Sequence, residues 1–75
     1  MNKKEFLAEW QKLEKEYDEI CKNLRDITKK MEDNICDEYV FTKCLNEIHC
    51  INKKMDENRE NLSSILKNYL GENFL

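Results

Sequence analysis

The side chains with the most chemical potential in this 75-residue chain are four cysteines, Cys21, Cys36, Cys44 and Cys50, and one histidine, His49. Structural zinc sites collect their ligands in short loops such as CxxC, or at positions i and i+4 of one helix face. No pair among these five residues has either spacing. We therefore expect no metal and no other cofactor. We interpret the cysteines as reduced structural thiols, and we leave open whether any of them is oxidised.

The spacing of the carboxylates, the histidine and the cysteines does not suggest catalysis. Carboxylates alternate with lysines at four-residue spacing, which is typical of a solvated helix face, and no His or Cys stands where it would activate a nucleophile. The chain has one glycine and no proline, so it has no Gly-rich loop that could hold a nucleotide phosphate. We therefore expect a protein that is not an enzyme and has no small-molecule substrate.

Nucleic-acid binding is the alternative to a role in protein–protein interaction. Trp10, Tyr17 and Tyr69 could stack on bases, but they fall on a heptad seam where core packing explains them better. The 13 lysines and arginines are outnumbered by 16 aspartates and glutamates, whereas general nucleic-acid binders are basic. We do not expect a nucleic-acid partner, and a small nucleic-acid-binding or transcription-regulating helical bundle remains the alternative.

Two apolar seams with alternating spacings of three and four residues determine where these side chains lie. The first seam contains Phe6, Trp10, Leu13, Tyr17, Ile20, Leu24, Ile27 and Met31, and the second contains Phe41, Cys44, Ile48, Ile51, Met55, Asn58, Leu62, Ile65 and Tyr69. They predict an all-α domain over residues 1–75, with helices over 3–33 and 38–70 and a short apolar tail over 71–75. Asn2 with Glu5 is typical of a helix start, and Gly71 of a helix end.

The chain is expected to reverse between the two helices and form an antiparallel, coiled-coil-like hairpin. When residues whose numbers add up to 75 are paired, as in Phe6 with Tyr69, nearly every layer is apolar. The exception opposes Asn58 to Tyr17, a pair that we expect to set the register through a hydrogen bond. The turn would occupy 34–37, with Asn34 left-handed and Asp37 capping the second helix. The alternative, a long parallel coiled coil, needs a three-residue stammer in the seam.

Further apolar residues lie outside the seams, and they predict a partner. We expect an interface formed by Leu7, Ile35, Tyr39, Val40, Leu45, Leu66, Leu70, Phe74 and Leu75. A stripe wider than one seam implies more than one neighbouring helix. The simplest arrangement is a homodimer of hairpins, which forms a four-helix bundle, and helices of another protein are the alternative.

No segment is apolar enough to cross a membrane, and residues 1–9 are charged where a signal peptide needs an apolar core. We therefore expect no membrane partner and an intracellular, cytoplasmic location, with a nuclear one left open. The predicted function is that of a protein–protein interaction module, which acts as a small subunit, adaptor or regulator of a larger assembly through its apolar seam and end patch.

Overall fold

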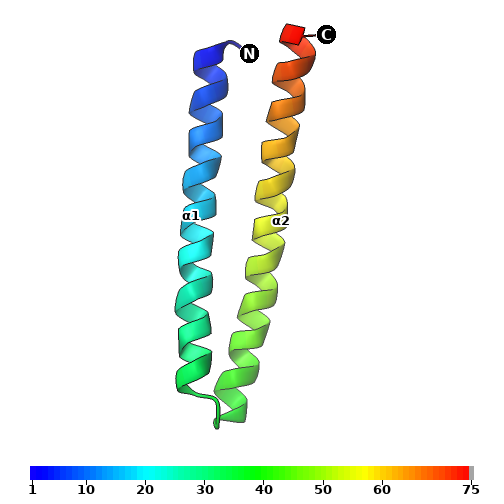
Figure 1. Ribbon diagram of the computed structural model, residues 1–75. Helices are drawn as coiled ribbons and strands as arrows, with labels where there is room; N and C mark the ends of the chain where they lie inside the picture. Colours follow the sequence, from blue (N-terminus) through cyan, green and yellow to red (C-terminus); the bar gives the residue numbers. More distant parts are fainter. Residues whose placement is uncertain (75) are drawn as a thin grey trace.

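The computed structural model describes residues 1–74 of the chain, and the side chains of residues 1–72. It consists of two helices, α1 (Lys3–Asp33) and α2 (Glu38–Phe74), which lie side by side and run in opposite directions (Figure 1). Both ends of the described chain lie at the end of the molecule opposite the turn. The predicted all-helical hairpin is confirmed, and the alternative of a straight chain in a long coiled coil is wrong.

The molecule is a thin rod with extents of 55 × 16 × 11 Å. Its radius of gyration is 17.1 Å, whereas a compact domain of this length would have a radius of gyration of about 11 Å. Neither helix combines the length and apolar character that a membrane span requires within the described residues. A two-helix rod has no side chain enclosed from all directions except along the line where its helices meet.

Capping side chains define the start of α1. The Asn2 side chain accepts a hydrogen bond from the backbone N–H of Glu5 at 2.8 Å, and its amide donates to the Glu5 carboxylate at 3.2 Å. These reciprocal bonds satisfy donors that the first turn of a helix otherwise leaves unpaired. The predicted helix start is confirmed.

The turn over residues 34–37 reverses the chain without any left-handed residue. Asn34 has φ −124° and ψ 30°, and no described residue other than glycine has a positive φ. The prediction of a left-handed Asn34 is therefore wrong. The Asn34 side chain instead donates to the Lys30 carbonyl at 2.8 Å, while its own carbonyl accepts from the N–H of Asp37 at 3.0 Å. A side-chain cap thus replaces the glycine that usually ends a helix.

Asp37 caps the start of α2, as predicted. Its carboxylate accepts a hydrogen bond from the N–H of Val40 at 3.2 Å, and its carbonyl accepts from the N–H of Phe41 at 2.9 Å. Helix α2 then runs to Phe74, four residues beyond the predicted end at Leu70. Gly71 has a helical backbone with a negative φ, so it does not stop the helix. A single glycine weakens a helix by only about 1 kcal/mol and does not end it without a cap.

The open end of the hairpin is joined by an ion pair. The amino group of Met1 lies 2.5 Å from a carboxylate oxygen of Glu72. The hydrogen bond to Glu72 raises the pKa of this amino group above its ordinary value. Both groups are in contact with water, so the pair adds little to stability.

The seam is the core, and it is narrow. The ring centroids of Phe6 and Tyr69 lie 4.6 Å apart, which confirms the layer in which residue numbers add up to 75. Among the described side chains, four are buried in the seam: Leu13, Cys44, Ile51 and Asn58. Every other predicted seam residue is half-buried. The seam is therefore predicted correctly throughout, but the hairpin alone covers only part of it.

Candidate interaction surface

The heptad pattern gives the hairpin two flanks that border the same seam. On one flank each helix contributes the residue that follows Leu13 or Cys44 and its heptad repeats, and we call this the leucine flank. It consists of Leu7, Glu14, Cys21 and Thr28 of α1 and Leu45, Asn52, Arg59 and Leu66 of α2. The opposite side, the polar flank, consists of Glu9, Glu16, Asn23 and Lys30 of α1 and Glu47, Lys54, Asn61 and Asn68 of α2.

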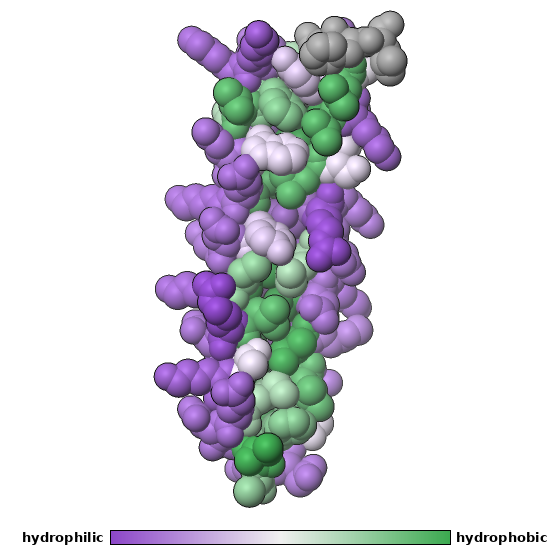
Figure 2. Space-filling model, in the orientation of Figure 1, coloured by the Kyte–Doolittle hydropathy of each residue, from purple (hydrophilic) through white to green (hydrophobic). Residues whose placement is uncertain are grey.

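The leucine flank carries three of the predicted interface residues, all of them exposed. Leu7 is 53% exposed, and Leu45 and Leu66 are exposed as well. Leu70, one turn beyond Leu66 on the same side of α2, is also exposed. Figure 2 shows an apolar stripe that runs along most of the molecule between two hydrophilic margins. The seam residues next to the leucine flank are only half-buried, so their side chains add to the apolar surface that the exposed leucines form.

A groove of about 410 Å³ interrupts the leucine flank near its middle. It is lined by Glu14, Tyr17, Asp18, Arg59 and Leu62. The indole N–H of Trp10 donates a hydrogen bond to the Glu14 carboxylate, which holds this acidic side chain against α1. The acidic groups come from α1 and the cation from α2, so the middle of this flank has opposite charges on its two helices.

The other predicted interface residues lie around the two ends. Ile35 lies in the turn and Tyr39 in the first turn of α2, and Tyr39 is 76% exposed. Val40 is half-buried, which makes it a smaller part of any interface than predicted, since its side chain already lies partly against the hairpin. The side chain of Phe74 and the whole of Leu75 lie outside the described part of the chain.

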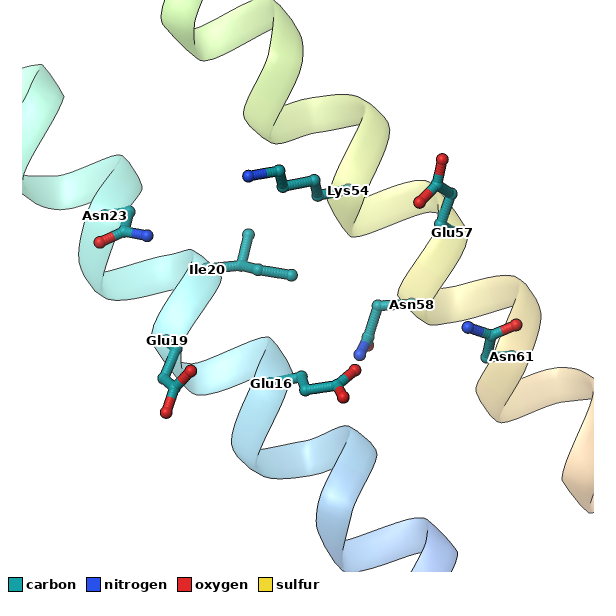
Figure 3. A pocket seen from close by; sticks show the side chains of 8 residues that line it. All are labelled: Glu16, Glu19, Ile20, Asn23, Lys54, Glu57, Asn58 and Asn61. Carbon is teal, nitrogen blue, oxygen red and sulfur yellow. The ribbon is translucent and has the colours of Figure 1, made fainter.

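The polar flank is hollowed near Asn58, as Figure 3 shows. The hollow has a volume of about 330 Å³ and is lined by Glu16, Glu19, Ile20, Asn23, Lys54, Glu57, Asn58 and Asn61. The Lys54 side chain extends toward α1, and the Glu16 carboxylate points toward Asn58 (Figure 3). Seven of these eight side chains are polar or charged, so water solvates this flank well and no apolar ligand fits it.

Asn58 is 3% exposed and bonds to the backbone of α1. Its amide N–H donates to the Leu13 carbonyl at 3.0 Å, while its Oδ1 has no hydrogen-bond partner within the described part of the chain. The predicted bond between Asn58 and Tyr17 is therefore not formed. The Leu13 carbonyl lies one turn before Tyr17 and within reach of the short amide, whereas Tyr17 lines the groove on the leucine flank.

The four thiols lie in different surroundings. Cys44 is 1% exposed and packs in the seam, Cys21 is half-buried, and Cys36 and Cys50 are exposed. All four are free. Within the described residues, no group of three or more His, Cys, Asp or Glu side chains could hold a metal ion.

The distinction between the two flanks was not predicted from the sequence, although Leu7, Leu45 and Leu66 share one heptad position. The signal was present in the sequence, because the residues at the corresponding position of the other flank are all charged or amide side chains. Comparing these two heptad positions would have identified the uncovered face.

Comparison with known proteins gives no match. No protein-family model, curated protein or solved structure matches this chain. The surface described above is thus the basis for a functional proposal.

Proposed function

We propose that this chain is a non-enzymatic helical interaction module, which works inside the cell as a small subunit, adaptor or regulator of a larger assembly. Helices of a partner cover its leucine flank and the adjoining end of α2. The partner is either another protein or a second hairpin, and the second case produces a four-helix bundle.

The observation that supports this proposal most is the apolar stripe that runs along most of one face of so thin a molecule, interrupted by one charged groove (Figure 2). Exposed leucines scattered singly over a surface need no explanation. Here Leu7, Leu45 and Leu66 recur at one heptad position and border seam residues that are themselves only half-buried. An apolar surface of this kind is typical of a site that binds other helices.

The experiment compares two double variants of α2 that add the same charge. Leu66→Asp with Leu70→Asp places two carboxylates on the leucine flank and the end next to it. Asn61→Asp with Asn68→Asp places two on the polar flank of the same helix. All four positions are exposed, so circular dichroism should report unchanged helix content in both variants.

The readout is the set of proteins that co-purify with the tagged chain, including an untagged copy of itself. We expect the leucine variant to lose its partners and the asparagine variant to keep them. If both variants retain the same partners as the wild type, the leucine flank is not the binding surface and the proposal is wrong.

A further inference from the structure

We infer that the leucine flank is covered by a second copy of this chain, packed with both turns at the same end of a four-helix bundle. This inference rests on the proposed function, because it names the partner for the same surface. It is carried by the exposed area of the hairpin, by the heights at which its flank residues lie, and by the charges at the middle of the flank.

The exposed area is larger than a chain of this size has when it folds alone. The hairpin exposes 6059 Å², whereas a compact monomer of 9.1 kDa would expose about 4,900 Å². The difference is roughly 1,200 Å², and a standard stable interface removes about 800 Å² from each partner. A second copy has the same additional exposed area, so one isologous contact between the two leucine flanks reduces the exposed area of both chains at once.

A two-fold axis along the rod fixes the register of such a dimer without any free choice. Rotation about this axis leaves every residue at its own height and places α1 against the partner's α2. Residues that are level within one hairpin are therefore level across the interface. The stacked rings of Phe6 and Tyr69 show that level residues have numbers that add up to about 75.

The flank residues that meet in this register are complementary. Leu7 lies level with the partner's Leu66, which joins apolar side chains at the open end. Glu14 lies level with the partner's Arg59, so the acidic side of the central groove meets a cation. Thr28 lies level with the partner's Leu45, and Cys21 with the partner's Asn52. No pair of like charges is brought together at these four levels.

The reversed arrangement, with the two turns at opposite ends, matches less well. It packs α1 against the partner's α1 and α2 against the partner's α2. Leu7 then lies level with the partner's Thr28, and Leu45 with the partner's Leu66. Glu14 lies level with the partner's Cys21, and Arg59 with the partner's Asn52. The charged groups of the central groove would then lose water without gaining an opposite charge, which is unfavourable.

The mass in solution is the first test. Sedimentation equilibrium over the micromolar range should give twice the monomer mass of 9.1 kDa for the wild type. Leu66→Asp with Leu70→Asp should give the monomer mass with helix content retained, and Asn61→Asp with Asn68→Asp should remain dimeric. A wild type that is monomeric throughout this range overturns the inference.

Disulfide pairing between two different chains tests the direction. Cys21, Cys36 and Cys50 are first replaced by serine, while buried Cys44 is kept, and thermal unfolding verifies that this background folds. One chain then carries Leu7→Cys and the other Leu66→Cys, and they are mixed in a glutathione redox buffer. We expect a mixed disulfide in high yield from this pair. A Leu45→Cys chain mixed with the Leu66→Cys chain reports the reversed arrangement, and we expect this pair to give little mixed disulfide.

Any other pattern overturns the inference. Preferential bonding of positions 45 and 66 establishes the reversed bundle, and failure of both pairs in a dimeric protein places the interface elsewhere. The proposed function is judged separately. Suppose that the wild type is monomeric, and that a protein which co-purifies with it no longer co-purifies with the leucine double variant. The inference of self-association is then wrong, while the proposed function as an interaction module is supported.

Discussion

The two flanks of this hairpin border the same seam, yet they differ in almost every property that matters for binding. The polar flank contains a solvated hollow whose lining includes Glu16, Asn23 and Lys54 (Figure 3). The leucine flank offers an apolar stripe interrupted by one charged groove (Figure 2). The contrast teaches that the closure of the hairpin and the character of its surface are specified at different heptad positions. The seam closes the hairpin, and a single heptad position next to it decides which flank carries the exposed leucines.

The largest expected effect comes from the seam itself, which both flanks share. Ile51 is 7% exposed, so Ile51→Ala should lower the free energy of unfolding by about 2–4 kcal/mol through lost burial and the cavity left behind. Urea denaturation followed by circular dichroism measures this change. Lys53→Ala, at an exposed position of α2 that belongs to neither flank, is the control and should change stability by less than about 0.5 kcal/mol. Equal effects at the two positions would contradict the assignment of the core.

A smaller effect on folding, but a large one on association, is expected on the leucine flank. Leu45→Asn removes an apolar side chain whose burial is worth about 1.5–3 kcal/mol, so it should weaken self-association at least tenfold. The chain should still fold as a helical hairpin when it is diluted below its dissociation constant. Sedimentation velocity over a concentration series measures the change.

The matched control for this change lies on the other flank. Glu47→Gln is close to Leu45 on α2 but on the polar flank, and it should leave association within about twofold of the wild type. If Glu47→Gln weakens association as much as Leu45→Asn does, both flanks are in the interface and the contrast between them does not hold.

The smallest expected effect is a gain in stability at the boundary of the seam and the polar flank. Asn58→Leu replaces a buried amide whose Oδ1 has no partner in the described chain, so it should raise the free energy of unfolding by about 1 kcal/mol. Thermal unfolding measures the gain, and Asn61→Leu, on the exposed polar flank, should not reproduce it. A lower melting temperature for Asn58→Leu would mean that the bond to the Leu13 carbonyl is worth more than the unpaired oxygen costs.

The buried amide also bears on specificity. A polar residue in an otherwise apolar seam restricts register, because a shifted pairing moves its amide away from the Leu13 carbonyl and buries it in another, apolar layer. The Asn58→Leu chain should therefore give broader sedimentation boundaries than the wild type, even though it is more stable. A single sharp dimer boundary would show that the apolar layers alone determine the register.

Much of this fold follows from residue spacing. Alternating steps of three and four residues predict every half-buried or buried seam position, and the constant sum of paired residue numbers predicts the hairpin. Local side-chain chemistry predicts the caps at Asn2 and Asp37, since each depends on residues only three positions apart. These features are periodic or local, so a single sequence is enough to predict them.

The features that were not predicted depend on three-dimensional competition between groups. Asn34 could have ended α1 through a left-handed backbone or through its side chain, and the bond to the Lys30 carbonyl favoured the second. Asn58 could have bonded to a phenol or to a backbone carbonyl, and the Leu13 carbonyl was within reach. Gly71 is compatible with both a helix interior and a helix end. Composition does not decide between partners that lie within one turn of each other.

The turn has a consequence for the connection between the two helices. No residue over 34–37 has a positive φ, and the segment contains neither proline nor glycine, so its backbone could become α-helical without strain. Within the turn, the hydrogen bonds of Asn34 and Asp37 favour the reversal. If these bonds were lost, each chain could straighten, with a stammer between its two seams, and exchange its second helix with a neighbour, which would pair the same residues between two molecules. The hairpin and a domain-swapped pair thus differ by a few side-chain hydrogen bonds, so the length of this molecule is a property that substitutions in four residues could change.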